Sequence, residues 1–560
     1  MDKTRKNNIT FSIIAAILIA LFCFALTPVT FQNDTFYTIK VGEQIQNNGI
    51  DMQEHFSWHE NLEYTYPHWL YDLITYKVYN LGGFKGLYIF TGIISAVLGL
   101  TLFFTNRSNS KNAFMSFFIT ITTMFLLRGF IAARAQLVTF ILFTLEYYII
   151  ERFVAKKKFI HVILLFLIAT LIANLHIAVW PFFFILFLPH IGARVWIWLG
   201  DKIATDKSLV NAYIKDIEKE KKKDPQSPRI KTLQEGLERE TKLREERIKR
   251  REEKVNNSYK VEYVRNNNVW LLIPIMMLCA FTGLLSPLGP GVTYTYLFKT
   301  VMGDTAQFIS EHLPTVVATN PSIVIYLIVF LGILIFTKVK ISLSDFFLNF
   351  GLLVLALITL RQTSMLILLG SFALTKLCAD ALLKDKSKYD EIINMLQSHK
   401  YLYFYIVLVV FGISTGSITE NLYSKFVDYK KYPVDATTYI KDNLDVNNIR
   451  LFNEYNFGSY LLLNDIPVFI DSRCDLYTPE YNPGVEVFDD FMHTRSLDIY
   501  PEDTFEKYNI THIIIAKDTP LYNVVDSQNG ILYNELYSDD YFVVYERILN
   551  SNSKVSLNDN

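Results

Sequence analysis

The first candidate for acid–base chemistry is Asp34, in the segment FQNDTFYTIKVG that follows the first long apolar run of the chain. The residues after it, TFYTIKVGEQIQNNG, predict a helix that ends near Gly49, so Asp34 could cap that helix by accepting backbone N–H bonds. Alternatively, its carboxylate could orient a substrate hydroxyl or accept its proton. The same loop carries a second acid, Glu54, beside His55 and His59 in GIDMQEHFSWHE. Both interpretations of Asp34 are open at this stage.

A second set of polar side chains falls at the ends of apolar segments. Three arginines among them are predicted to lie at one depth, where guanidinium groups match the geometry of a phosphate or diphosphate. Taken singly, each arginine could instead reach ordinary lipid headgroups, and Glu311–His312 could be an exposed loop pair. Ionisable groups at membrane depth are nevertheless functional candidates by default. The complete set is Arg128, Arg134, Asn174, His176, Glu311, His312 and Arg361.

Composition limits the class of protein that can hold these groups. Of 560 residues, 51% are hydrophobic, and the mean hydropathy of +0.22 is too high for an ordinary soluble domain. The formal net charge of -1 gives no indication of nucleic-acid binding. Only Cys474 of the four cysteines lies in a polar segment, so neither a disulfide framework nor a cysteine metal site is predicted.

The predicted architecture follows from the long apolar runs of the chain. A helix needs roughly 20 apolar residues to cross a bilayer. We expect a mainly α polytopic membrane protein of about 11 transmembrane helices. The first run is interpreted as a retained helix, because its apolar core is too long for a signal peptide and no small-residue cleavage site follows it. The predicted spans are 10–30, 86–105, 112–128, 135–151, 159–175, 177–199, 269–287, 321–338, 343–360, 363–382 and 401–418.

Basic residues orient these spans. Clusters of Lys and Arg precede the first span and follow the second, fourth, eighth and tenth, so with this number of spans they all fall on one side. That side should be cytoplasmic. The protein is therefore expected in the cell membrane, with a cytoplasmic N-terminus. The predicted parts are a transmembrane domain at 1–419, which includes an external first loop at 31–85 and a charged cytoplasmic insertion at 200–265, and an extracytoplasmic α/β domain at 420–560.

Two hydrophilic regions predict structures of their own. Mixed charges at helical spacing in the insertion predict a solvated helical hairpin broken at Pro225 and Pro228, with 205–258 as a surface for a cytoplasmic partner. In the C-terminal region, helical segments at 433–444 and 504–509 alternate with strand-like runs, which indicates a partly parallel sheet. The predicted strands are 450–453, 467–471, 512–516 and 541–547.

Two further segments have both a structural and a functional interpretation. DSRCDLY follows a predicted strand, and ligands gather at the carboxyl ends of parallel strands. Its charged residues, Asp471, Arg473 and Asp475, either contact a carbohydrate or phosphate or form a turn held by an Asp–Arg pair. In the first loop, HWLYDLITYKVYNLGG places its apolar side chains near one face, which predicts an amphipathic helix lying on the membrane.

The order of these features resembles the GT-C class of integral-membrane glycosyltransferases, and more closely a poorly characterised bacterial group within that class. The resemblance is carried by DTFYTIKVGEQIQNNGI, EHFSWHENLEYTYPHWLYDL with LGGFKGL, RAQLVTFILF, ANLHIAVWP, LLSPLGPG with ISEHLP, and FNEYNFGSYLLLNDIPVFIDSRCDLY. It implies a cytoplasmic N-terminus, many helices and a catalytic acid in an external first loop that contains horizontal helices. It also implies a donor sugar linked to a polyprenyl phosphate and, in many members, an external soluble domain.

The resemblance carries over residue by residue. Asp34 matches the position of the catalytic acid of the first loop, and Glu54 matches a second acid in that loop. Arg134 and His176 match polar positions at external helix ends. The sequence departs from the protein O-mannosyltransferases of this class, which have two adjacent acids in the first loop, because Thr35 follows Asp34. Its second external loop also lacks an acid pair. No bound metal and no other cofactor is therefore predicted.

The predicted function is transfer of a sugar from a polyprenyl-phosphate donor to an extracytoplasmic glycan, lipid or protein. Asp34 would act on the acceptor hydroxyl with Glu54 or His176, while the three arginines, with Glu311 and His312, would bind the phosphate. Membrane lipids are expected partners and nucleic acid is not. A non-catalytic carrier or flippase for a lipid-linked sugar is the alternative, because it would use the same arginines without carboxylate chemistry. A non-enzymatic assembly protein for cell-envelope glycans is a third.

Overall fold

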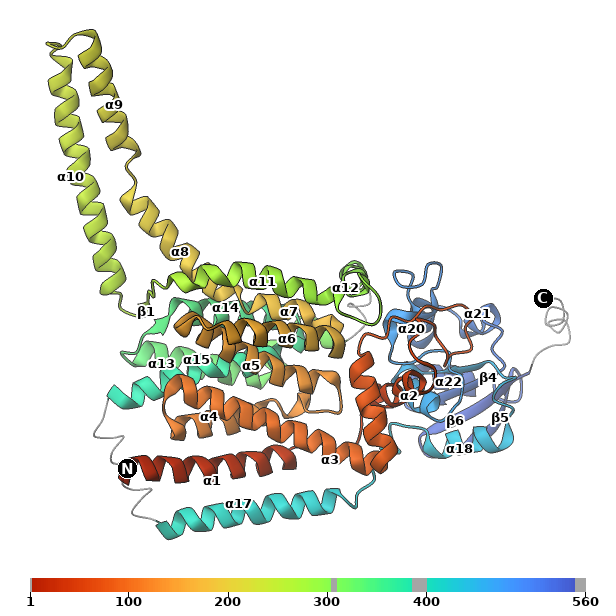
Figure 1. Cartoon of the computed structure of the whole chain (residues 1–560). Coiled ribbons are helices and arrows are strands. Elements are labelled where there is room, and N and C mark those ends of the chain that lie inside the picture. Colours follow the sequence, from red (N-terminus) through yellow and green to blue (C-terminus); the bar gives the residue numbers. More distant parts are fainter. Residues whose placement is uncertain (1–2, 304–309, 385–399, 549–560) are drawn as a thin grey trace.

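The computed structural model describes residues 3–303, 310–384 and 400–548. Most of the basic cluster predicted after the tenth span, and the chain end at 549–560, lie outside the described residues. Helices run side by side to form a body, with an α/β domain at one end and a long helical hairpin projecting from the other (Figure 1). The two hydrophilic parts of the chain are thus separated by the whole length of the helical body.

The apolar runs fold as helices, since a helix satisfies its own backbone hydrogen bonds where water is absent. Helices occur at every predicted span, and their inward side chains, such as Phe103, Phe140 and Leu366, form one large apolar core. The body helices are α1 (Lys3–Ala25), α3 (Trp69–Ser110), α4 (Ala113–Leu126), α5 (Ala135–Lys156), α6 (Phe159–Leu175), α7 (Trp180–Ile185), α8 (Leu188–Thr205), α11 (Leu272–Ala280), α13 (Pro321–Phe336), α14 (Leu343–Ile358), α15 (Thr363–Lys384) and α17 (Lys400–Asn421).

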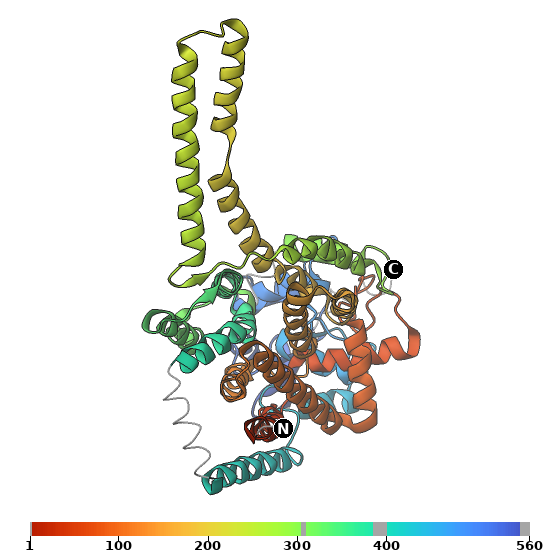
Figure 2. The same cartoon turned by 60° about the vertical axis from the view of Figure 1, so that its left-hand side comes forward.

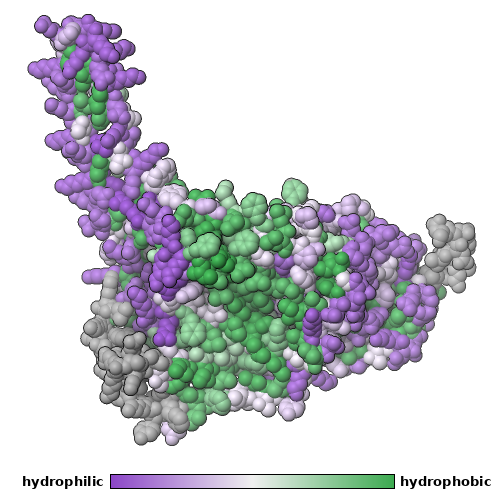
Figure 3. All heavy atoms as spheres, in the orientation of Figure 1, coloured by the Kyte–Doolittle hydropathy of each residue, from purple (hydrophilic) through white to green (hydrophobic). Residues whose placement is uncertain are grey.

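Length and composition identify four helical stretches of the described chain as able to cross a membrane. Five shorter helices of 10–17 residues are also apolar. Apolar side chains cover the flank of the body between the two hydrophilic ends (Figure 3). The chain is therefore built as a membrane protein, while about 11 spans stay a prediction. The four stretches are Trp69–Ser110, Ile177–Lys223, Asn267–Leu284 and Leu360–Leu382.

The charged insertion forms a two-helix hairpin that leaves the body as a single arm (Figures 1 and 2). Its helices are α9 (Ser208–Lys223) and α10 (Arg229–Asn256), and the chain reverses between them in the segment that contains the two prolines. At the base of the arm, Asp201 lies 3.0 Å from Arg251 and 3.0 Å from Arg265. A short parallel pair, β1 (Val261–Glu262) and β2 (Ile341–Ser342), follows the hairpin.

The C-terminal domain is a four-stranded sheet in the order β3-β4-β6-β5, with helices packed around it. β3 and β4 are parallel, and β6 runs antiparallel to both of its neighbours. Residues 533–538 form a strand that the sequence analysis missed. The elements are α18 (Val434–Asn443), β3 (Leu451–Asn453), α19 (Tyr455–Leu463), α20 (Val487–Ser496), α21 (Pro501–Lys507), β4 (His512–Ala516), α22 (Pro520–Asp526), β5 (Tyr533–Ser538) and β6 (Phe542–Arg547).

The strand predicted at 467–471 is wrong. Its one bridge joins Val468 to Ser57 of the first loop. The side chain of Asn453 takes the place of a neighbouring strand, because its Oδ1 accepts from the Phe469 N–H (2.8 Å) and its Nδ2 donates to the Ile470 carbonyl (2.7 Å). This extended segment therefore lies between β3 and the first loop rather than in the sheet.

The first loop consists of α2 (Asn33–Asn48), an irregular stretch and the beginning of α3. The two helices come very close at Gly42, where a Cβ would lie 2.1 Å from the Asp72 carbonyl oxygen. α3 is broken at Gly83, whose φ of 58° suits glycine. In Figure 1 the part of α3 before this break runs across the ends of the body helices. The predicted horizontal helix is thus a separate segment of α3.

The first loop and the C-terminal domain share one apolar core. The Phe36 ring of α2 meets the rings of Tyr432 and Tyr460 edge to face, at 4.9 and 5.2 Å between centroids. The Trp58 indole N–H donates to the Leu451 carbonyl of β3 (3.1 Å). The loop therefore fixes the domain onto the end of the helical body, and the polar residues of both are held in one place.

Candidate functional site

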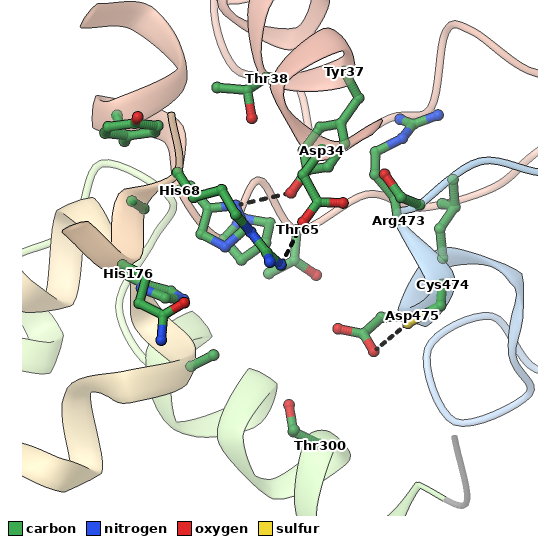
Figure 4. A pocket seen from close by; sticks show the side chains of 18 of the residues that line it. Asp34, Tyr37, Thr38, Thr65, His68, His176, Thr300, Arg473, Cys474 and Asp475 are labelled. Carbon is green, nitrogen blue, oxygen red and sulfur yellow. Dashed lines mark hydrogen bonds and ion pairs between the residues drawn. The ribbon is translucent and has the colours of Figure 1, made fainter. Parts of the chain in front are cut away.

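A cavity of about 400 Å³ lies where the first loop, the ends of the body helices and the C-terminal domain meet. This volume is in the range of small-molecule sites, roughly 300–1,000 Å³. Figure 4 shows Asp34, His176 and Asp475 around one common space. Glu54 and Arg128 lie outside the lining. Eight of the residues singled out from the sequence line the cavity: Asp34, Arg134, His176, Glu311, His312, Arg361, Arg473 and Asp475.

Asp34 lies in the first turn of α2, and the N-cap residue is Gln32. The predicted N-cap role of Asp34 is therefore wrong. Its carboxylate instead forms an ion pair with Arg134, the residue that precedes α5. A second, longer contact joins Arg134 to Glu311 at 3.4 Å. The negative charge of Asp34, followed by that of Glu311, raises the pKa of the Arg134 guanidinium.

The Asp34–Arg134 pair is only partly covered. The side chains are 22% and 26% exposed, respectively, and both line the cavity. A guanidinium carries five N–H donors in a planar fork, so Arg134 can hold a carboxylate and still offer donors to an anion. The pair is thus open to a ligand on its cavity side.

Arg361 is the cation of this cavity that has no acidic partner. It lies in η8 (Leu360–Gln362), between α14 and α15, and its guanidinium forms no ion pair with any described residue. Two backbone bonds, from Leu360 N to the Leu313 carbonyl (3.0 Å) and from Thr315 N to the Leu357 carbonyl (3.2 Å), fix η8 beside the segment that carries Glu311 and His312. A half-buried, unpaired guanidinium favours an anionic ligand.

Two imidazoles form the wall opposite the C-terminal domain. The rings of His68 and His176 lie 5.0 Å apart, and Tyr37 OH is 3.5 Å from His68 Nδ1. Burial lowers the pKa of His68 to about 4, and it lowers the pKa of His176 well below its usual range. Both rings are therefore neutral near pH 7. Among the described residues, the buried Nδ1 of His176 has no hydrogen-bond partner.

Asp475 is a cavity acid that the sequence singles out only as part of DSRCDLY, and not among the predicted catalytic or phosphate-binding residues. It comes from the C-terminal domain, and its Oδ2 accepts from Tyr296 OH of α12 (Val292–Met302) at 2.9 Å. The Cys474 thiol lies 3.6 Å from its Oδ1. Burial raises the pKa of Asp475. The sequence does not reveal that Asp475 belongs to this site, because its contact with Tyr296 joins residues 179 positions apart.

Arg128 does not join the other arginines. It begins the short turn η1 (Arg128–Phe130), its side chain is exposed, and its guanidinium stacks on the Phe125 ring at 4.5 Å. The turn directs Arg128 away from the cavity, although it comes only a few residues before Arg134. The prediction that three arginines bind a phosphate together is therefore corrected: only Arg134 and Arg361 of the three line the cavity.

Glu54 is held in a different ion pair. Its Oε1 lies 2.8 Å from Arg473 Nη2, and its carboxylate also accepts from the N–H groups of Phe56 (2.8 Å) and Ser57 (2.9 Å). Arg473 is paired in turn with Asp471 at 2.7 Å. Figure 4 shows the Arg473 side chain directed away from the common space. The suggested role of Glu54 beside Asp34 is thus corrected: the carboxylate joins the first loop to the C-terminal domain.

The acids of the cavity are distributed over separate walls. Within residues 3–303, 310–384 and 400–548, no group of three or more His, Cys, Asp or Glu side chains could hold a metal ion. What the cavity does bring together is an open carboxylate–guanidinium pair, an unpaired guanidinium, a neutral imidazole and a second carboxyl group. This set can bind a phosphate and a hydroxyl compound side by side.

Comparison with known proteins gives a fold but no family. The sequence matches no known protein family and no curated protein. The structure is similar to the crystal structure of the Archaeoglobus fulgidus oligosaccharyltransferase in its apo form, with a TM-score of 0.51 and 10% sequence identity. The similarity covers 91% of this chain and 69% of that chain. The chain therefore shares the overall fold of that oligosaccharyltransferase.

Proposed function

We propose that this protein is a membrane glycosyltransferase that moves a sugar from a polyprenyl-phosphate donor to an extracytoplasmic acceptor. The observation that carries the proposal is the cavity itself, where Asp34–Arg134 and the unpaired Arg361 meet at the boundary between the apolar body and the polar domain. A lipid-linked substrate needs such a boundary, because its chain stays in the bilayer and its headgroup is polar. The fold shared with an oligosaccharyltransferase supports the same reaction class.

In the proposed reaction the acceptor hydroxyl attacks the anomeric carbon of the donor sugar. The bond from that carbon to the phosphate oxygen breaks, and the polyprenyl phosphate leaves with the bonding electrons. Arg361 and the free donors of Arg134 stabilise the charge that develops on the phosphate. Asp34 accepts the proton of the acceptor hydroxyl, and Arg134 holds its carboxylate in position. The neutral His176 binds a sugar hydroxyl through its free nitrogen.

The proposed orientation places the C-terminal domain outside the cell and the hairpin in the cytoplasm. The two lie at opposite ends of the helical body (Figure 1), which is consistent with the distribution of basic residues along the chain. In this orientation the cavity opens on the extracytoplasmic side. The hairpin residues 205–258 remain a proposed surface for a cytoplasmic partner, and deleting them should leave the cavity intact.

The decisive experiment replaces Asp34 by Asn and measures sugar transfer by the full-length protein in proteoliposomes with a panel of synthetic polyprenyl-phosphate sugars. Loss of a general base lowers the rate by about 10²- to 10⁴-fold. The matched control is Asp51→Asn, an exposed acid of the same loop whose partners are His55 and Tyr66, and it should keep wild-type activity. Unchanged transfer by Asp34→Asn would refute catalysis by this residue. Transport of the donor without any transfer would favour a carrier instead.

A further inference from the structure

A second cavity lies inside the C-terminal domain and has no part in the proposed reaction. Its volume is about 540 Å³, and it forms at the carboxyl ends of the parallel strands β3 and β4. Glu454 follows β3 directly, while Asp518 comes shortly after β4. Ligands in α/β sheets gather at this edge, where the chains leaving neighbouring strands diverge. We call this space the domain cavity.

One short segment separates the domain cavity from the first cavity. Tyr455 lines the first cavity, whereas its neighbours Glu454 and Asn456 line the domain cavity. The same short backbone segment therefore borders both cavities. After this segment, α19 packs closely on the chain at Ile470, since a Cβ at Gly458 would lie 2.0 Å from the Ile470 carbonyl oxygen.

Three cationic side chains line the domain cavity without any ion pair to a described residue. They are Lys430 and Lys431, which precede α18, and Arg495 of α20. Lys507 of the same domain, by contrast, pairs with Asp490 at 2.7 Å and with Glu486 at 3.1 Å. An uncompensated group of one guanidinium and two ammonium groups attracts an anion.

The floor of the domain cavity is a buried carboxyl group. Glu454 is 2% exposed, and its Oε1 accepts from the Ala516 N–H at 2.9 Å. Burial raises the pKa of Glu454 to about 7, against the opposing effect of Arg495, while the nearby Asp518 acts in the same direction as burial. Below that pH the group is neutral and can donate a hydrogen bond, so the cavity then carries three cations and the single exposed acid Asp518.

We propose that the domain cavity is a binding site for a phosphate monoester, carried either by a small sugar phosphate or by a phosphate-bearing glycan. Arg495 binds the phosphate through its planar fork, and Lys430 and Lys431 supply further positive charge. The protonated carboxyl of Glu454 donates to a phosphate oxygen. Binding here involves no bond making or breaking, so it stands or fails independently of the proposed glycosyl transfer.

The test is calorimetric titration of the purified full-length protein with glucose 6-phosphate, with inorganic phosphate and with glucose. Glucose 6-phosphate should bind and glucose should not. Arg495→Gln and Lys431→Gln should each weaken binding about tenfold or more, as expected for loss of a charge-assisted hydrogen bond. The control Lys441→Gln removes an exposed cation of α18 outside the cavity and should change nothing. Equal affinity for both phosphates supports recognition of the phosphate group alone, and tighter binding of the sugar phosphate supports recognition of the sugar as well.

A pH series with inorganic sulfate, whose charge stays constant, isolates Glu454. Sulfate binding should weaken as the pH rises through about 7, because the carboxyl group becomes an anion on the cavity floor. The charged groups that line the cavity with it are Arg495, Lys430, Lys431 and Asp518. Glu454→Gln should abolish the pH dependence while keeping the affinity.

The proposal is overturned if glucose 6-phosphate fails to bind, if Lys441→Gln weakens binding as much as Arg495→Gln, or if sulfate binding by Glu454→Gln depends on pH as it does in the wild type.

Discussion

The first loop forms two carboxylate–guanidinium pairs, and their surroundings differ completely. Glu54 and Arg473 are 1% and 2% exposed, whereas Asp34 and Arg134 are 22% and 26% exposed. Arg473 is bound on the other side by Asp471, at 2.7 Å. The closed pair is a connection between the first loop and the C-terminal domain. The open pair, Asp34 and Arg134, faces a cavity, so both side chains can also form hydrogen bonds to a ligand.

The two pairs consist of the same kinds of group, a carboxylate and a guanidinium. They differ in how many further hydrogen bonds and ring contacts each group makes. The Glu54 carboxylate accepts from two backbone N–H groups and from the Ser57 hydroxyl at 2.8 Å. The Arg473 guanidinium lies 5.1 Å from the Phe56 ring and 5.0 Å from the Tyr64 ring. Such a set of contacts specifies one arrangement of two chain segments. A site that must bind and release substrate needs fewer fixed partners.

The largest expected effect on stability comes from breaking the closed pair. Arg473→Leu leaves the carboxylates of Glu54 and Asp471 buried without a cation, and removing one partner of a buried pair costs about 3–5 kcal/mol. The midpoint of thermal unfolding of the purified protein should fall strongly. Glu54→Gln should cost less, because Arg473 keeps Asp471 and the amide still accepts hydrogen bonds. An Arg473→Leu protein that unfolds at the wild-type temperature would show that this pair does not hold the domain in place.

Removing the unpaired cation of the cavity, Arg361, should lower the reaction rate rather than the stability. Arg361→Gln removes the unpaired guanidinium, and loss of one group that stabilises developing charge lowers kcat by about 10²- to 10³-fold. Thermal stability should change little, since no described ion pair is lost. The matched control is Arg128→Gln, an exposed arginine that is stacked on Phe125 outside the cavity. Equal activity of the two variants would remove Arg361 from the proposed site.

Replacing His176 should weaken substrate binding while leaving the stability of the protein unchanged or higher. Its buried Nδ1 lacks a partner among the described residues, which costs free energy in the unliganded protein. His176→Phe keeps the ring and removes that polar atom, so the unfolding temperature should stay equal or rise. The loss of one hydrogen bond to substrate, worth about 1 kcal/mol, should raise KM by roughly fivefold with little change in kcat. A fall in both stability and kcat would indicate a purely structural histidine.

Sequence patterns located most of the architecture. Apolar runs marked the helices because their length and composition reflect the solvent that surrounds them. Mixed charge marked the hairpin at 205–258, β-branched runs marked β4 and β6, and the short run RLFN marked β3. The segment 467–471 failed because its hydrogen bonds go to the Asn453 side chain and to the first loop, and an apolar run cannot reveal which partner it has.

The candidate site could be predicted only where side chains lie at helix ends of known depth. Arg134, His176 and Arg361 satisfied that condition, and all three line the cavity. Arg128 satisfied it too, but the direction of a three-residue turn depends on local packing. Glu54 failed because its partner Arg473 is 419 positions away, beyond what a loop pattern can indicate.

The smallest expected change in stability comes from removing a solvent-exposed ion pair. It shows how little such a pair contributes compared with the buried pair of Glu54 and Arg473. Lys507 contacts Asp490 and Glu486 in the C-terminal domain, and its side chain is 47% exposed. Exposed pairs contribute about 0–1 kcal/mol, because water already stabilises the separated charges. Lys507→Ala should therefore shift thermal unfolding only slightly, and the shift should disappear at high salt, where screening acts over a few ångströms. A salt-independent loss as large as that of Arg473→Leu would show that burial does not explain why the first loop's two pairs differ.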